Sequence, residues 1–193
     1  MRVMRSSFRE YIEQSSRLLH DSGEAIHQKL LDQAEDMVMS AISSGKPLLA
    51  CGNGGSASDA MHLTAELVGR FLKERRPLKV LCLSDNPALL TAWSNDCGYE
   101  TVFARQVEAY GETGAVLLGI STSGQSRNVI AAFHQARAMG MKTIALTGEG
   151  GGQLASLSDC LLAVPSRSTP LIQQVHICVY HYLCERIEER ILA

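Results

Sequence analysis

The sequence predicts an α/β fold, a three-layer sandwich with a five-stranded parallel sheet of the flavodoxin-like kind and an N-terminal helical extension. Five short apolar runs alternate with helical patterns along the chain. The runs are continuous and do not alternate with polar residues, which is typical of strands buried on both faces. Strands that alternate with helices imply right-handed crossovers and therefore a parallel sheet.

The first element is helical. Residues 4–44 have helical periodicity throughout, and Ser43, Ser44 and Gly45 end the pattern. One stripe repeats at close to 3.6 residues and contains Ile26, Leu30, Leu31, Ala34, Met37, Val38 and Ile42. We therefore expect a single domain over 1–193, with a helical extension over 1–45 and an α/β core over 46–193.

The apolar runs are the expected strands. In chain order they are "PLLAC" (47–51), "LKVLCL" (78–83), "AVLLGI" (115–120), "KTIALT" (142–147) and "CLLAVP" (160–165). A long helix is expected over 171–192. In a parallel sheet of this kind, ligands bind outside the carboxyl ends of the strands. The segments that follow the strands are therefore the candidate site.

Composition excludes several classes of protein. The net charge of −2 gives no electrostatic footprint for nucleic acid, and no apolar run approaches the ~18 residues of a membrane span. The N-terminus is too charged for a signal peptide, so we expect a cytoplasmic protein without nucleic-acid or membrane partners. The six cysteines form no CxxC pair, and we expect reduced, buried thiols rather than a cysteine zinc site.

The segment "STSGQS" follows the third expected strand and is rich in hydroxyls. Ser121, Thr122, Ser123 and Ser126 stand where a helix begins. The unpaired N–H groups and positive partial charge of a helix N-terminus suit a phosphate. The segment contains no lysine and does not match GxxxxGK[ST], so a sugar phosphate fits better than a mononucleotide. The alternative is a hydroxyl-rich helix cap without a ligand.

The segment after the first strand, "CGNGGSASDAMHLTAEL", is glycine-rich. Gly52, Gly54 and Gly55 permit a tight turn, and Ser56 or Ser58 is expected to cap the next helix. The pattern is GxGG rather than GxGxxG, which disfavours a dinucleotide site.

Two helices carry candidate metal ligands. His62 and Glu66 are four residues apart and share one helix face, as metal ligands or as a chance pair on a solvated surface. Gln173 and His181 are about 12 Å apart along a helix. One ion could contact both if the side chains lean together, if Gln173 precedes the helix, or if a neighbouring subunit contributes a ligand. His176 is more readily interpreted as a packed helix histidine.

Together these motifs resemble the sugar isomerase (SIS) domain family and, within it, the phosphoheptose isomerases. The resemblance covers nearly the whole chain. It is carried by "CGNGGSASDAMHLTAEL", "SND" (94–96), "GAVLLGISTSGQS", "ALTGEGGG" and "IQQVHICVYH". It implies a five-stranded parallel sheet and a homotetramer with active sites at the subunit interfaces.

The resemblance also implies roles for individual residues. Substrate contacts are expected from Asn53, Gly54, Gly55, Ser56, Glu66, Asn95, Asp96 and Gln173, and phosphate contacts from Ser121, Thr122, Ser123 and Ser126. One zinc ion per subunit is expected on His62, Glu66, Gln173 and His181, and the catalytic pair is Glu66 and His181. The chain departs from the family at Leu171 and Gln174, where members often have arginine and glutamate.

The implied activity is an aldose–ketose isomerisation. D-sedoheptulose 7-phosphate would become D-glycero-D-manno-heptose 7-phosphate through an enediol, with Glu66 as base and His181 as acid. One alternative is a non-catalytic SIS protein that binds the bacterial replication initiator, but that relative lacks the metal and base residues retained here. A sugar-phosphate-sensing regulator would need an added DNA-binding domain. An isomerase of another phosphosugar stays open.

Overall fold

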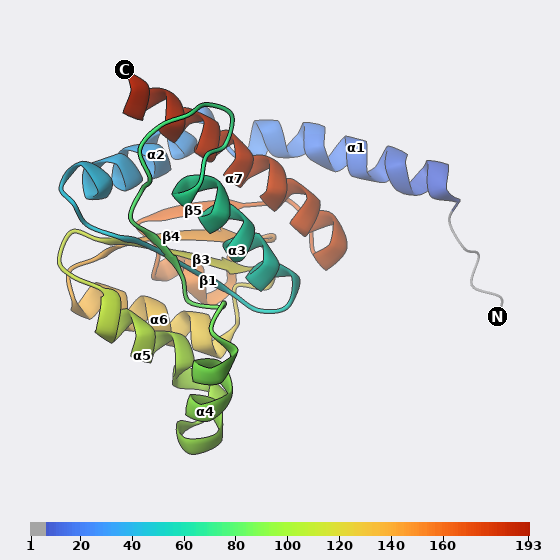
Figure 1. Ribbon diagram of the computed structural model, residues 1–193. Helices are drawn as coiled ribbons and strands as arrows, with labels where there is room; N and C mark the ends of the chain where they lie inside the picture. Colours follow the sequence, from blue (N-terminus) through green and yellow to red (C-terminus); the bar gives the residue numbers. More distant parts are fainter. Residues whose placement is uncertain (1–6) are drawn as a thin grey trace.

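The computed structural model describes residues 7–193 and contains a five-stranded parallel sheet (Figure 1). The strands are β1 (Leu48–Gly52), β2 (Val80–Cys82), β3 (Val116–Ser121), β4 (Lys142–Thr147) and β5 (Cys160–Ala163). Their order is β2-β1-β3-β4-β5, and every pair is parallel. The predicted flavodoxin-like sheet is thereby confirmed.

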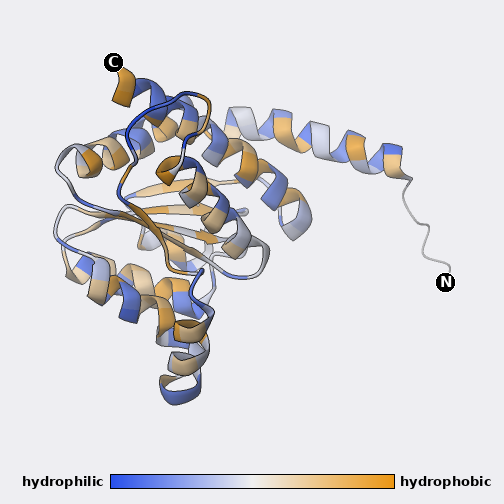
Figure 2. Cartoon of the chain, viewed as in Figure 1, coloured by the Kyte–Doolittle hydropathy of each residue, from blue (hydrophilic) through white to orange (hydrophobic). Residues whose placement is uncertain are grey.

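Helices cover both faces of the sheet. They are α1 (Phe8–Ala25), α2 (Gln28–Ser43), α3 (Gly55–Val68), α4 (Pro87–Cys97), α5 (Val102–Tyr110), α6 (Arg127–Ala138) and α7 (Thr169–Leu192). Residues of α2, α3 and α7 form one apolar core with the sheet, and residues of α5 and α6 form the other. The result is the predicted three-layer sandwich. Figure 2 shows mostly hydrophobic strands between helices that carry both hydrophilic and hydrophobic residues.

The prediction of one continuous helix over residues 4–44 is wrong. The structure has two helices, with a break at Ile26 and His27, whose backbones leave the helical region. Ile26 is buried in the core, so the chain turns there and lets α2 pack on the sheet, while α1 projects from the body (Figure 1). Ser7 and Glu10 start α1 with a reciprocal capping box. Residues 4–6 of the predicted helix lie outside the described residues.

The helix α2 packs in the same core as the sheet. Ala34, Val38 and Ile42 are buried against strands and α7. Helix α2 therefore shares a core with the strands, while one domain over 1–193 stays a prediction. Among residues 7–193, no helix is both long and apolar enough to cross a membrane.

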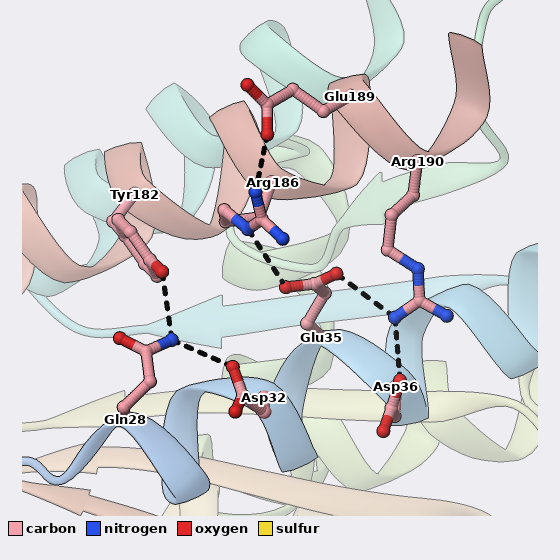
Figure 3. Close-up of polar contacts among 8 residues, drawn as sticks. All are labelled: Gln28, Asp32, Glu35, Asp36, Tyr182, Arg186, Glu189 and Arg190. Atoms are coloured by element: carbon pink, nitrogen blue, oxygen red, sulfur yellow. Dashed lines mark hydrogen bonds and ion pairs between the residues drawn. The ribbon is translucent and has the colours of Figure 1, made fainter. Parts of the chain in front are cut away.

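Polar contacts on the outer side bind α2 to α7 (Figure 3). Arg190 Nη1 lies 3.0 Å from Glu35 Oε1 and 2.6 Å from Asp36 Oδ1. Gln28 Nε2 donates to the hydroxyl of Tyr182 over 2.9 Å. These contacts hold the carboxyl-terminal half of α7, which carries the candidate ligand His181, against the body of the protein.

Helices α3 and α7 lie side by side and run in the same direction (Figure 1). Gly55 at the start of α3 faces Gln173, and His62 farther along faces Tyr180 and His181. Beyond the end of α3, the backbone of residues 71–73 meets Glu188. The residue numbers of the contacting pairs therefore differ by a nearly constant amount. The two helices that carry the predicted metal ligands, α3 and α7, thus lie parallel and in register.

Candidate functional site

The side chains of His62, Glu66 and His181 meet between α3 and α7. His62 Nε2 lies 3.1 Å from Glu66 Oε1, as expected for residues four apart on one helix face. The rings of His62 and His181 are 4.9 Å apart and nearly perpendicular, at 87°. Three of the four predicted metal ligands, including both members of the predicted catalytic pair, are therefore neighbours within one chain.

The surroundings of His181 favour the neutral form of its ring. Burial lowers the pKa of His181, and the nearby His62 lowers it further, while the Glu66 carboxylate opposes the shift. Its Nε2 atom is buried and has no hydrogen-bond partner among residues 7–193. An unpartnered buried ring nitrogen of this kind is available to bind a cation or to exchange a proton with a ligand.

Gln173 does not join this cluster in the contacts of the single chain. It lies within α7, so the alternative that places it before the helix is wrong. Its side-chain amide packs directly against Gly55, where a Cβ atom would collide with it. Gln173 is therefore next to the glycine-rich turn after β1, two turns of α7 before His181.

The donor set suits zinc in type and, for one pair, in spacing. Two ligands of one tetrahedral zinc ion lie about 3.3 Å apart if each bond is about 2.05 Å. The 3.1 Å between His62 Nε2 and Glu66 Oε1 is close to that value. Within the described residues, no three His, Cys, Asp or Glu side chains are already arranged as a complete metal site.

The hydroxyl-rich segment begins at Ser121, the last residue of β3, and leads into α6. Ser121 Oγ and Ser126 Oγ are hydrogen bonded over 2.9 Å, and Thr122 Oγ1 lies 3.3 Å from Thr169 Oγ1. Ser126 is the N-cap residue of α6, without a side-chain cap. The cap residue therefore leaves the first backbone N–H groups of α6 without a side-chain partner, although Val129 N in the same turn donates to Asn128 Oδ1 over 3.0 Å.

A cleft of about 340 Å³ opens beside this segment. Its lining is Thr122, Ser123, Gln125, Glu149, Gly152, Ser166, Arg167 and Thr169. Arg167, which forms an ion pair with Glu149, is a cation that the sequence analysis did not single out. Its position before the last helix carries no motif by which it could have been found.

Glycines allow the hydroxyl-rich segment to pack closely against the turn that follows β4. Gly124 has a φ of +63°, and a Cβ atom on it would collide with the carbonyl oxygen of Gly151. Leu154 N also donates to the Gly124 carbonyl oxygen over 3.2 Å. The segment therefore rests on the "GEGGG" turn after β4 through a contact that only glycine allows.

The turn after β1 holds Asn53 in a network of amides. Asn53 and Asn128 exchange two side-chain hydrogen bonds of 2.9 Å, and the Tyr99 hydroxyl donates to Asn53 Oδ1 over 2.7 Å. Asn128 was missed because one asparagine in an amphipathic helix carries no distinctive signal. The prediction that Ser56 or Ser58 caps α3 is wrong, since Gly54 is the N-cap residue and has no side chain to donate or accept.

Asn95 and Asp96 lie away from the α3–α7 cluster. Both are exposed on α4, and Asn95 Nδ2 donates to Asp96 Oδ1 over 2.8 Å. Helix α4 is at the opposite end of the molecule from α7 (Figure 1). Within one chain, the structure does not bring these two residues to His62 and Glu66.

The interpretation of His176 as a packed helix histidine is confirmed. Its side chain is fully buried, and its Nε2 atom lies 3.1 Å from the carbonyl oxygen of Thr147. All six cysteines are free thiols, as predicted, and four are buried, but Cys97 and Cys178 are exposed.

Comparisons with known proteins agree with this geometry. The model of the SIS domain family matches residues 10–148. A phosphoheptose isomerase of Crocosphaera subtropica is 48% identical over 165 residues, which cover 86% of this chain and 84% of the relative. The structure of a phosphoheptose isomerase from Neisseria gonorrhoeae matches with a TM-score of 0.88 and 39% identity, over 94% of this chain and 96% of that one. A phosphoheptose isomerase from Francisella tularensis matches with a TM-score of 0.90 and 36% identity, over the same shares of the two chains.

Proposed function

Since this chain belongs to the SIS domain family and, within it, to the phosphoheptose isomerases, we propose that it converts D-sedoheptulose 7-phosphate to D-glycero-D-manno-heptose 7-phosphate. It is a sugar-phosphate isomerase, and thus an intramolecular oxidoreductase. The observation that carries the proposed mechanism is the meeting of Glu66 and His181 around His62 between two parallel helices.

The reaction moves one proton between two carbons. A base removes a proton from C1 of the ketose, the electron pair forms the C1–C2 double bond of an enediol, and a proton added at C2 yields the aldose. Glu66 is the proposed base for both carbon transfers. Its side chain is 23% exposed, so the carboxylate is reachable by substrate. General bases of this type contribute about 10²–10⁴-fold to a rate.

The oxygens also exchange a proton during the reaction. The C2 carbonyl becomes a hydroxyl while the C1 hydroxyl becomes a carbonyl. His181 is the proposed acid, because its Nε2 atom is free of protein partners among residues 7–193 and can take the proton released by the C1 hydroxyl and give it to the C2 oxygen. A zinc ion on His62, Glu66, Gln173 and His181, one per subunit, would supply a Lewis acid for the charge on these oxygens. A carboxylate that is held tightly by a cation is a weaker base. We therefore propose that Glu66 acts mainly as the base and that its contact with the zinc ion is variable.

The hydroxyl-rich segment is the proposed phosphate site. Ser121, Thr122, Ser123 and Ser126, with the first backbone N–H groups of α6, would hold the phosphate at the far end of the sugar. Anchoring the phosphate keeps C1 and C2 aligned with Glu66, which lowers the entropy cost of reaction. Asn53 and the glycine-rich turn Gly54–Ser56 are proposed to contact the sugar, with Asn95 and Asp96 contributed through assembly.

A homotetramer with active sites at subunit interfaces is part of the proposal. Apolar residues of α1 support it, since Phe8, Ile12 and Leu19 are 79%, 50% and 38% exposed. Assembly would bury such residues, and it would also allow a neighbouring chain to supply residues that stand apart in one chain. The charged substrate and the reduced cysteines support the cytoplasmic location predicted from the sequence.

The experiment that tests this function is direct. The protein is incubated with sedoheptulose 7-phosphate, and the appearance of an aldoheptose phosphate is followed by NMR. Reaction in deuterated water should also place deuterium at C2, because the base exchanges its proton with solvent. A protein that leaves this ketose unchanged but isomerises another phosphosugar would refute the substrate. A protein that isomerises neither this ketose nor any other phosphosugar would favour the non-catalytic alternative.

A further inference from the structure

Tyr180 places its hydroxyl against the candidate metal ligand His62. The Tyr180 side chain is fully buried, and its hydroxyl oxygen lies 2.9 Å from His62 Nδ1. The two rings meet edge to face, with centroids 5.5 Å apart. His62 therefore has one nitrogen toward Tyr180 and the other, Nε2, toward Glu66.

A buried carboxylate decides which group donates in this contact. Asp59 lies one turn before His62 on α3 and is buried, and its Oδ2 atom has no hydrogen-bond partner in the described part of the chain. Burial raises the pKa of Asp59 to about 6, with His62 and Tyr180 opposing the shift. The unpartnered Oδ2 atom is an acceptor for the phenolic hydrogen of Tyr180, and a phenol that turns its hydrogen to Asp59 leaves its oxygen to accept from His62.

We propose that Tyr180 is a positioning residue for His62, whose Nδ1–H donates to the Tyr180 hydroxyl so that the lone pair of Nε2 points at a metal ion beside Glu66. The inference rests on the metal site of the proposed function. Metal-binding histidines commonly donate their second ring N–H to a neighbouring group, which fixes the ring and its tautomer. Here the neighbouring group is a phenol whose own hydrogen is drawn to Asp59.

The orientation of His62 has a further physical consequence. With the proton on Nδ1, a lone pair on Nε2 faces the Glu66 carboxylate at 3.1 Å, and two acceptors at that distance repel each other. A cation between them removes the repulsion. Tyr180 would thus raise the affinity of the site for metal without touching the metal itself.

The test compares zinc binding to four proteins. Wild type, Tyr180→Phe, Tyr182→Phe and His62→Gln are titrated with zinc in competition with a chromophoric chelator. Tyr182 is the matched control, because it lies on the same helix and its hydroxyl contacts Gln28 instead (Figure 3). We expect Tyr180→Phe to bind zinc about 10–100-fold more weakly than wild type, the usual effect of removing such a partner, and Tyr182→Phe to bind as wild type.

A spectroscopic signature separates positioning from a merely structural role. In zinc-loaded, ¹⁵N-histidine-labelled wild type, the Nδ1–H of His62 should give a slowly exchanging NMR signal, assigned by its absence in His62→Gln. The signal should persist in Tyr182→Phe and exchange rapidly in Tyr180→Phe. Should Tyr180→Phe not fold, Asp59→Asn is the second variant, and it is also expected to weaken zinc binding.

The outcomes distinguish the two proposals. Wild-type zinc affinity in Tyr180→Phe (or, if that variant does not fold, in Asp59→Asn), together with loss of zinc in His62→Gln, would overturn the role of Tyr180 and leave the metal site standing. A wild type that binds no zinc, or a His62→Gln variant that binds it equally well, would overturn the metal site and with it the inference drawn from it.

Discussion

Arg75 and Glu188 form an ion pair that is buried from solvent, with Arg75 Nε 3.5 Å from Glu188 Oε1 and side chains 1% and 2% exposed. Glu188 belongs to α7 and accepts the backbone N–H groups of residues 71–73. Arg75 donates to the backbone carbonyl oxygen of Glu66 over 2.7 Å. The pair therefore links the end of α3 that carries Glu66 to the helix that carries His181.

Glu188→Gln should destabilise the protein strongly. The substitution leaves a buried guanidinium without its counter-charge, and breaking such pairs costs about 3–5 kcal/mol. The free energy of unfolding, measured with urea, checks the magnitude. The matched control is Glu100→Gln, whose partner Arg127 is 80% exposed and whose loss should leave stability unchanged. Equal stability of the two variants would contradict the structural role of the buried pair.

His176 should make the fold less stable as the pH falls below neutrality. Burial lowers the pKa of His176 from 6.5 to about 4, with its contact to the Thr147 carbonyl opposing the shift. The unfolded chain therefore binds a proton near pH 6.5 that the folded chain excludes. The stability contributed is present above pH 6.5 and lost as the pH falls to about 4, a change of about 3 kcal/mol.

The comparison of wild type with His176→Gln isolates this contribution. Glutamine does not titrate, so the variant should lose less stability than wild type between pH 6.5 and 4, although it is less stable at neutral pH. Urea unfolding at several pH values gives both curves. Parallel curves would show that His176 does not carry the pH dependence.

Glu66→Gln should abolish most of the isomerase activity and preserve the fold. An amide cannot remove a proton from carbon, so the rate should fall at least ~100-fold, while the affinity for the phosphate end of the substrate is retained. The NMR assay with sedoheptulose 7-phosphate gives the rate. Glu108→Gln makes the same chemical change on an exposed residue of α5 and should be fully active. A near-normal rate in Glu66→Gln would remove this residue from the mechanism.

The purified protein should contain close to one zinc ion per chain. Removal by a chelator should lower activity, and added zinc should restore it, because the charge on the substrate oxygens would otherwise lack a Lewis acid. Elemental analysis measures the content before and after chelation. Full activity of the metal-free protein would refute this role.

The order of elements was predictable because strands buried on both faces must be continuous in apolar residues. That rule located β1 and β3 within one residue of their observed ends. The spacing of His62 and Glu66 also sufficed to place them on one face. The break at Ile26 was not predictable, because a buried residue at a turn has the same apolar character as one inside a helix.

Which helices are neighbours cannot be read from local patterns. The parallel register of α3 and α7, which brings Tyr180 to His62 and Gln173 to Gly55, depends on the packing of the whole core. Tyr180 was missed for this reason, since a tyrosine in an apolar helix is usually a core residue. Asp59 had a usable signal, because it precedes His62 by one helical turn.

Gly124→Ala should weaken substrate binding more than it weakens the fold. The added methyl group would collide with the Gly151 carbonyl oxygen, so the segment with Ser121 and Ser126 must shift away from the turn that supports it. We expect KM for the sugar phosphate to rise at least ~10-fold with a smaller change in kcat, since phosphate binding would be uniform in ground and transition states. Inhibition by inorganic phosphate should weaken in parallel. Gly45→Ala is the matched control, because Gly45 has a similar φ of +73° but no atom within 4 Å of the added carbon. Both variants bear a similar backbone strain of about 1–2 kcal/mol, so an equal rise in KM in the two would show that strain, and not the displaced phosphate segment, is the cause.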